Sequence, residues 1–383
     1  RKRTPALWVQ ENEPEIWGKV AYYVPMNLYL NYRLIGVLRD SASNMVGHFP
    51  VNFKTGKNYS KDAPKGVIYG VDPMKVPVAC KVGEKIGEIT NEASKLTGLP
   101  VGIPYITTGY DKSCEALGCG AITKSFAHIS YGTASSIAVV SKRYFEPEPF
   151  LPSYLTCYPG YYSGEVQIYR GYWMLHWFSE EFAEKQSMEA SIENLAVEEY
   201  LNKKLMEIKP GCEGLVLQPY WGPGLSRPLA KGAIIGFYDV HTKYHIYRAI
   251  IEGIAFALKE GLGSIRKKTR TPIRSITVSG GGSKSDAICQ ITADIFNINV
   301  LKSETYESSS LGCAMSQFIS LGIYTNASEA KAKMVRYVRT FHPDAVASKE
   351  YKRLYSSVYK KIYPRLKGVY RELHNIQEEA VEK

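Results

Sequence analysis

The sequence predicts an α/β protein built from layered sheets, because segments typical of strands alternate with segments typical of helices. A strand over residues 273–278 runs into three glycines and a helix over residues 287–296, and the next strand follows at residues 298–301. Apolar residues keep helical spacing over residues 245–268, which predicts a long core helix. At 383 residues the chain is long enough for two or three domains of about 100–200 residues each.

The composition argues against a membrane protein. With 45% hydrophobic and 22% charged residues, the chain has the balance of an ordinary soluble globular protein. No window approaches the ~18 unbroken apolar residues of a membrane span, and the first residues lack the apolar run of a signal peptide. We therefore expect no membrane partner.

The cysteines and the net charge exclude further classes. Seven cysteines are scattered without any Cys-x-x-Cys pair, so we expect neither a disulfide framework nor a zinc site, but reduced thiols in the cytoplasm. The net charge of +11 is typical of many nucleic-acid-binding proteins, but the Lys and Arg residues are dispersed over helical patterns and fit solvated faces. We expect no nucleic-acid partner, and we expect the charge to attract an anionic ligand such as a nucleotide.

The first hundred residues predict mainly helices. Residues 11–36 have helical spacing, with Asn12 as a candidate cap. Residues 81–98 predict another helix, which ends at Gly98. Polar residues between these segments predict loops.

The stretch from Pro104 to Ser136 is the centre of the functional prediction. A strand over residues 103–108 leads to Asp111, a helix follows over residues 113–122, and two later strands flank a turn at Gly132-Thr133. This order places one carboxylate beside a turn whose backbone can approach a phosphate. The plainer alternatives stay open: an Asp after a strand is most often a turn or cap residue, and a Gly-Thr pair suits any hairpin.

The rest of the chain continues the alternation. After a Pro-, Tyr- and Glu-rich insert at residues 144–164, we expect a strand over residues 214–220. Further helices are predicted over residues 171–185, 189–207, 307–321, 327–337 and 346–375.

The segment from Ser279 to Asp286 is a strand, a glycine loop and a helix start, in which backbone N–H groups can approach a nucleotide. A Walker loop needs Gly where Ser283 stands, and a Rossmann fingerprint needs Gly or Ala where Ser285 stands. Both familiar motifs fail by one residue. The loop by itself leaves open a nucleotide site or a tight turn between strand and helix.

These motifs together resemble the FGGY carbohydrate kinases. The most specific match is Gly232 to Phe237, followed after seven residues by His245 to Glu252, which fits that family's C-terminal signature. The triple glycine, followed by Gln290 and Asp294, resembles the family's adenosine loop. Tyr131-Gly132-Thr133 looks like its second phosphate loop, and Asp111 falls where the family keeps its catalytic base.

The resemblance implies a two-lobed α/β ATPase of the actin/hexokinase type, with a ribonuclease H-like fold and an incomplete first lobe. Residues 1–123 are expected to form the rest of the N-terminal lobe, with the sugar side and the base, and residues 124–383 the ATP-binding C-terminal lobe. The implied activity is ATP-dependent phosphorylation of a hydroxyl group on a sugar or polyol. The alternative is a catalytically inactive sugar or nucleotide sensor of the same fold, and a homodimer is left open.

The resemblance also assigns roles to single residues. Asp111 would be the general base, and Gly132 and Thr133 would hold the β- and γ-phosphates of ATP. The adenosine pocket would be lined by Gly281, Gly282 and Ser285, with Mg²⁺ bridging phosphate oxygens. Two histidines that are tempting as bases, His128 and His176, are expected to be structural.

Departures from the family pattern carry expectations of their own. The family's first strand and its Asp-x-Gly-Thr loop do not precede Arg1, so we expect an N-terminal deletion or a segment outside this sequence, and no kinase activity from the 383 residues alone. Lys112 stands where a polar amide is common, and Tyr172 replaces a glycine that often touches ATP. These two replacements put the adenosine contacts and the substrate in question more than the fold.

Overall fold

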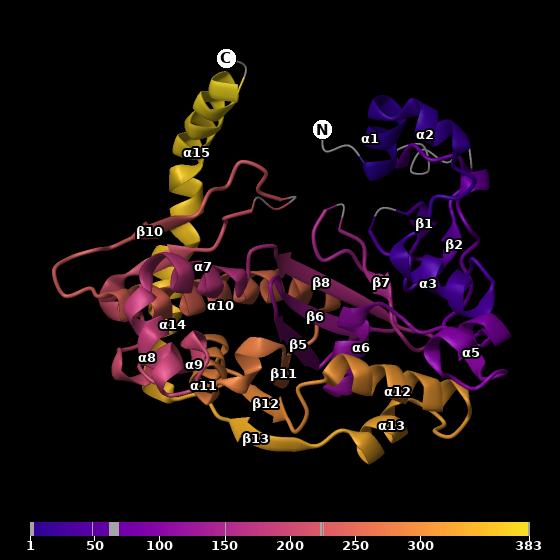
Figure 1. The fold of residues 1–383 in the computed structure, drawn as a ribbon. Coiled ribbons are helices and arrows are strands. Elements are labelled where there is room, and N and C mark those ends of the chain that lie inside the picture. The colour runs from indigo at the N-terminus through magenta and orange to yellow at the C-terminus, as the bar shows by residue number, and fades with distance from the viewer. Residues whose placement is uncertain are drawn as a thin grey trace.

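The computed structural model describes residues 4–47, 49–60, 69–149, 151–222, 224 and 226–381 (Figure 1). Its helices are α1 Pro5–Asn12, α2 Pro14–Lys19, α3 Met26–Ile35, α5 Asn91–Thr97, α6 Asp111–Gly118, α7 Trp173–Phe182, α8 Glu184–Ile192, α9 Val197–Asn202, α10 Lys243–Thr269, α11 Asp286–Phe296, α12 Ser308–Ser320, α13 Ala327–Met334, α14 Ala345–Leu354 and α15 Lys360–Val381. Its strands are β1 Val51–Asn52, β2 Lys57–Asn58, β3 Lys85–Glu88, β4 Pro104–Ile106, β5 Phe126–Tyr131, β6 Ser135–Ser141, β7 Tyr154–Leu155, β8 Tyr162–Ile168, β9 Val216–Gln218, β10 Ala233–Ile235, β11 Ser275–Ser279, β12 Asn299–Ser303 and β13 Tyr337–Phe341.

A seven-stranded mixed sheet forms the centre of the molecule, and its strand order is β13-β12-β11-β5-β6-β8-β7. The central strand β11 pairs parallel with both β12 and β5. The remaining pairs, β12 with β13, β5 with β6, β6 with β8 and β7 with β8, are antiparallel. Separate two-stranded sheets in the described ranges pair β1 with β2, β3 with β4 and β9 with β10. The α/β prediction is confirmed.

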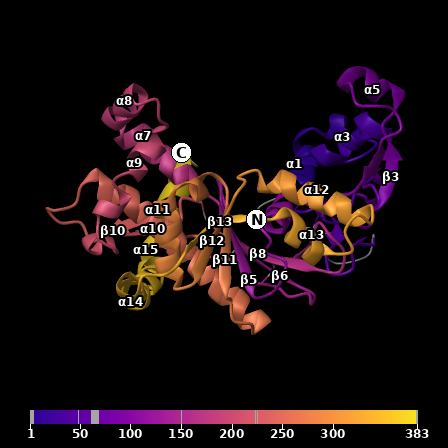
Figure 2. The ribbon, with the colours of Figure 1, turned by 90° about the horizontal axis from the view of Figure 1, so that it is seen from below.

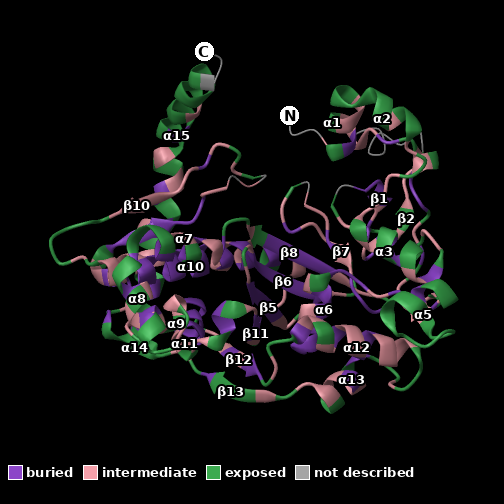
Figure 3. Ribbon diagram, in the orientation of Figure 1, coloured by how far each residue is buried: buried purple, intermediate pink, exposed green. Residues whose placement is uncertain are grey.

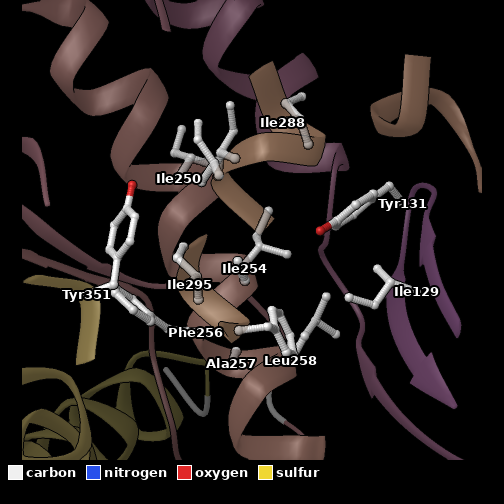
Figure 4. Packing of buried hydrophobic residues seen from close by; sticks show 14 of the residues in the cluster. Ile129, Tyr131, Ile250, Ile254, Phe256, Ala257, Leu258, Ile288, Ile295 and Tyr351 are labelled. Carbon is white, nitrogen blue, oxygen red and sulfur yellow. The ribbon is translucent and has the colours of Figure 1, made fainter. Parts of the chain in front are cut away.

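The main hydrophobic core lies between this sheet and α10, the long helix that the sequence predicts. Ile129 and Tyr131 of β5 meet Ile254 and Leu258 of α10, as Figure 4 shows. Thr242 and His245 form a capping box at the start of α10. Burial of so many aliphatic side chains in one cluster fixes the position of the sheet relative to this helix.

The opposite face of the sheet is covered by α12, as Figure 2 shows, and by α6, which lies beside α12 in Figure 1. The two helices touch at glycines: a Cβ atom on Gly118 would lie 2.0 Å from the carbonyl oxygen of Ser308, and one on Gly312 would lie 1.9 Å from that of Cys114. No side chain fits at either position. The helix that begins with Asp111 is therefore held rigidly against α12 by backbone contact.

Two predicted helices are partly wrong. Residues 85–88 form β3 within the predicted helix 81–98, and only α5 and its left-handed cap Gly98 match the prediction. Residues 337–341 form β13, where the prediction continued a helix to 337. Each strand is short and forms because it pairs with a partner strand, β3 with β4 and β13 with β12. The sequence does not show this pairing, and the helical spacing of the longer surrounding window therefore led to the prediction of a helix.

Smaller differences concern helix ends. Asn12 does not cap a helix but donates from Nδ2 to the carbonyl of Trp8, and Glu13 is the residue that precedes α2. The predicted helix 189–207 is broken into the end of α8, α9 and a short 3-10 turn. The helix predicted over 346–375 is α14 and α15, joined by a π-helical turn at residues 355–359. The outer part of α15 projects from the body and is largely exposed (Figure 3).

Candidate functional site

A cavity of about 1030 Å³ opens beside Asp111. Its wall comes from the start of α6, from β8, from residues before β8 such as Leu151 and Tyr154, from the loop after β9 and from the second half of α10, together with Phe53 and Tyr69. The charged residues of the wall include Asp111, Lys112, Glu165, Arg227 and Glu260. Only Asp111 among the predicted site residues lines this cavity.

Asp111 is the first residue of α6, and its side chain is exposed to the cavity. Its Oδ1 accepts a hydrogen bond of 2.8 Å from the backbone N–H of Lys112. The positive end of the helix dipole lies at this position. An ionised carboxylate in a cavity is the form that a general base requires.

Lys112 connects the start of α6 to the central sheet. Its Nζ donates to Glu115 Oε2 at 3.1 Å and to the hydroxyl of Ser130, on β5, at 2.9 Å. Ser130 lies two residues before Gly132, so this bond brings Asp111 and the turn at Gly132-Thr133 to the same region. Burial raises the pKa of Glu115, but hydrogen bonding and charge from His128, with the charge of Lys112, outweigh burial and lower it to about 2.

His128 is buried in β5 and lies on the face of the sheet covered by α6. Its two ring nitrogens lie 3.1 Å from the hydroxyl oxygens of Thr277 and Ser279, and Nε2 lies 3.8 Å from Glu115 Oε2. Burial lowers its pKa, but interactions with Cys119 and Glu115 outweigh burial and raise it to about 9. These contacts fit the structural role expected for His128, whereas His176 lies exposed on α7 beside Glu180.

We expect the stability that His128 contributes to depend on pH. Its pKa in the folded state is above the unfolded value of about 6.5, so the contribution is complete below that pH and is lost as the pH rises through about 9. Urea denaturation should show that His128→Gln costs more unfolding free energy at about pH 6 than at about pH 9.5. The exposed His176→Gln serves as control and should show no such difference. An equal cost of His128→Gln at both pH values would contradict a charged His128.

The predicted phosphate turn and glycine loop lie next to each other. The carbonyls of Gly132 and Thr133 accept hydrogen bonds from the N–H groups of Tyr172 and Trp173 at 3.1 and 3.3 Å. Gly280 has φ of 79°, and a Cβ atom there would lie 2.5 Å from the carbonyl oxygen of Tyr131. The pairing of β5 with β11 thus brings both loops to the same edge of the sheet, with Thr133 and Gly281 exposed.

Within the glycine loop, the predicted residues have different surroundings. Gly282 is buried, and a Cβ atom there would lie 2.4 Å from the ring of Tyr172, whose centroid is 4.8 Å from that of Tyr131. Ser285 caps α11, since its side chain accepts from the N–H of Ile288 at 3.4 Å. Tyr172 stands where the family often has a glycine that touches ATP. Its ring fills the space beside Gly282.

Two residues of the adenosine-loop resemblance make internal contacts. Gln290 Nε2 donates to Asp294 Oδ1 at 2.8 Å and to the carbonyl of His342 at 2.9 Å. Asp294 Oδ1 also accepts from the N–H of Asp344 at 2.8 Å. In this structure both side chains hold the segment between β13 and α14 against α11.

Sequence reasoning missed Glu165. The insert assigned to residues 144–164 ends in β8, and Glu165 lies in the middle of that strand, paired with Ala138 of β6. The available signal was a charged residue inside an alternating run from Tyr162 to Ile168. Its position in the cavity depends on the register of β6 and β8, which the sequence pattern alone does not give.

Two family models match most of the chain. The N-terminal domain of the FGGY family of carbohydrate kinases matches residues 4–118, and the C-terminal domain of the same family matches residues 127–321. In the described ranges, no helix is both long enough and apolar enough to cross a lipid bilayer.

Individual relatives agree with these matches. An uncharacterized sugar kinase of Escherichia coli, YgcE, is 30% identical over 348 residues, which cover 89% of this chain and 69% of that protein. The crystal structure of a xylulose kinase from Rhodospirillum rubrum superposes with a TM-score of 0.81 at 25% identity, covering 96% of this chain and 72% of the other. A gluconate kinase structure from Lactobacillus acidophilus has the same TM-score of 0.81 at 21% identity and the same coverages, 96% and 72%. The two-lobed fold expected above is the fold of these kinases.

Proposed function

Since the chain belongs to the FGGY family of carbohydrate kinases and is a sugar kinase with ATP as phosphate donor, we propose that Asp111 is its general base. We also propose that the acceptor binds in the cavity beside Asp111. The observation that carries the proposal is the exposed carboxylate at the start of α6, which faces a cavity of about 1030 Å³. A cavity of this size is large enough for a sugar or polyol.

In the proposed reaction, a hydroxyl group of the acceptor donates its proton to a carboxylate oxygen of Asp111. The oxygen then forms a bond to the γ-phosphorus of ATP, the bond from that phosphorus to the bridging oxygen breaks, and ADP leaves. Phosphoryl transfer needs positioning and charge neutralisation more than covalent chemistry from the protein. The rigid contact of α6 with α12 supplies the positioning of Asp111.

We assign the nucleotide to the two loops at the edge of the central sheet. Gly132 and Thr133 would hold the β- and γ-phosphates, while Gly281, Gly282 and Ser285 would line the adenosine side. The support is their adjacency and the exposure of Thr133 and Gly281. The hydrogen bond from Lys112 to Ser130 then links the base to the phosphate turn.

The metal is proposed to come with the nucleotide. In the part of the chain that the structure describes, no three His, Cys, Asp or Glu side chains gather where they could hold a metal ion. The chemistry that Mg²⁺ would supply when bound is neutralisation of the charge on the phosphates. The lobe boundary is proposed to lie between residues 123 and 124, just before β5.

The substrate class is tested by release of ADP from the full-length protein against a panel of acceptors. Relatives are named for xylulose, which is uncharged, and for gluconate, which carries a carboxylate, so the panel contains ketoses, polyols and aldonates. We expect ADP release that depends on both ATP and one class of acceptor. Absence of acceptor-dependent ADP release with every member would contradict the proposed function.

A further inference from the structure

Glu165 is a buried carboxylate in the wall of the cavity. Its partner across the sheet, Ala138, is in turn paired with His128, so Glu165 lies on the face of the sheet that α6 covers. Only 9% of the residue is exposed, and it lines the same cavity as Asp111. The side chain is therefore removed from bulk water but in contact with the space for a ligand.

One oxygen of this carboxylate lacks a hydrogen-bond donor. Among the described residues, none donates to Glu165 Oε1. A buried acceptor without a donor is costly, and such atoms in folded proteins call for an explanation. Burial raises the pKa of Glu165, while a hydrogen bond with Ser136 and the positive charge of Lys112 oppose that rise and the negative charges of Asp111 and Glu115 add to it. A ligand hydroxyl that donates to Oε1 would supply the missing partner.

The cations of the inner wall already have partners. Lys112 pairs with Glu115 at 3.1 Å, and Arg227 pairs with Glu260 at 2.7 Å while also donating to the hydroxyl of Tyr220. The other two cations of the wall, Lys267 and Lys268, are exposed near the end of α10.

The carboxylates beside the reacting position have no such partner. Within the described residues, neither Asp111 nor Glu165 has a Lys, Arg or His nitrogen within 4.0 Å. An acceptor that carries its own carboxylate would lie against the carboxyl groups of Asp111 and Glu165, whereas the cations of the wall that have no partner among the described residues, Lys267 and Lys268, lie near the end of α10.

We propose that Glu165 binds a hydroxyl group of the acceptor through Oε1 and excludes acceptors that carry a carboxylate, so that the enzyme phosphorylates uncharged sugars or polyols and not sugar acids. The inference rests on the proposed function, because it places the acceptor in the cavity beside Asp111. Glu165 and Asp111 then have separate tasks. Glu165 holds one hydroxyl group and selects by charge, and Asp111 takes the proton of the hydroxyl group that reacts.

The test compares Glu165→Gln with the wild-type full-length protein. Gln keeps the size and an acceptor oxygen but removes the charge, so it separates charge selection from packing. We expect the KM for the uncharged acceptor to rise about tenfold, the KM for ATP to stay within about twofold, and kcat to stay within about threefold. The ratio of kcat/KM for gluconate to kcat/KM for the uncharged acceptor should rise at least about tenfold.

The matched control is Glu350→Gln, which removes the same charge from an exposed position on α14 and should leave all of these constants unchanged. Thermal denaturation of both variants checks that each is folded. Unchanged acceptor KM and unchanged selectivity in Glu165→Gln would overturn the inference, as would a wild-type preference for gluconate. These results leave the proposed function intact.

Failure of the proposed function has a different signature, which is the absence of acceptor-dependent ADP release. Calorimetric titration of the wild type and Glu165→Gln with xylulose and with gluconate then decides the inference without turnover. Weaker xylulose binding in the variant supports it. Equal xylulose affinities in the two proteins contradict it.

Discussion

Replacing Asp111 by Asn is expected to lower kcat by a factor of about 10² to 10⁴, the contribution typical of a positioned general base. The amide cannot take the proton of the acceptor hydroxyl at neutral pH. It keeps the size of the side chain, and its oxygen still accepts from the N–H of Lys112, so α6 should start in the same place. The KM values for ATP and for the acceptor should change little. Steady-state ADP release, with ATP and the acceptor varied in turn, measures kcat and the two KM values.

The matched control for this experiment is Asp344→Asn. Asp344 is also an acid at the start of a helix, where its Oδ1 accepts from the N–H groups of Val346 and Ala347. Asn caps helices equally well, and Asp344 lies outside the cavity wall, so activity should be retained. Undiminished turnover by Asp111→Asn would remove Asp111 from the mechanism and leave the fold assignment untouched.

The largest expected effect on stability comes from Glu252→Leu. Glu252 and Arg248 form an ion pair of 2.7 Å on α10, and the two side chains are only 3% and 2% exposed. Glu252 Oε1 also accepts from the hydroxyl of Tyr351 at 2.6 Å and from the N–H of Gly211 at 3.2 Å. Removal of the carboxylate leaves a buried guanidinium without its counter-charge. We expect a loss of about 3–5 kcal/mol in the free energy of unfolding, measured by urea denaturation.

A double variant separates the pair from the packing around it. Arg248→Met with Glu252→Leu removes both charges together, so its cost should be smaller than that of Glu252→Leu alone. Glu207→Leu is the surface control, because the pair of Glu207 with Lys204 is exposed and should cost less than about 1 kcal/mol. A double variant less stable than the single one would show that the buried pair is net stabilising.

This pair also explains part of the C-terminal signature that the sequence shares with its family. Arg248 donates to the carbonyls of Leu205 and Ile208 and to the hydroxyl of Tyr351 at 2.9 Å. The polar residues of the signature thus connect α10 to α14 and to the loop before β9. In this structure they hold the core together and do not line the cavity.

The central helix and the alternation of strands with helices could be predicted because each is encoded locally. Twenty-seven residues of α10 repeat the apolar spacing of a buried helix, so no partner is needed to recognise it. By contrast, β3 has four residues and β13 has five, and each becomes a strand by pairing with a neighbour distant in sequence. Propensity over so few residues does not outweigh tertiary context.

In the candidate site too, some features are encoded locally and others depend on tertiary contacts. Asp111 and the two glycine loops stand at turns with a recognisable order of strand, turn and helix, so the sequence by itself determined the family, the fold class and these candidate residues. Only the tertiary structure decided that Gly118 and Gly312 bring two helices into contact beside Asp111, and that Tyr172 lies over Gly282. It also decided that Glu165 faces the cavity with no donor to one of its oxygens among the described residues. Local pattern records which conformation a segment prefers, whereas burial and partnership depend on strand register and helix contact between residues far apart in the chain.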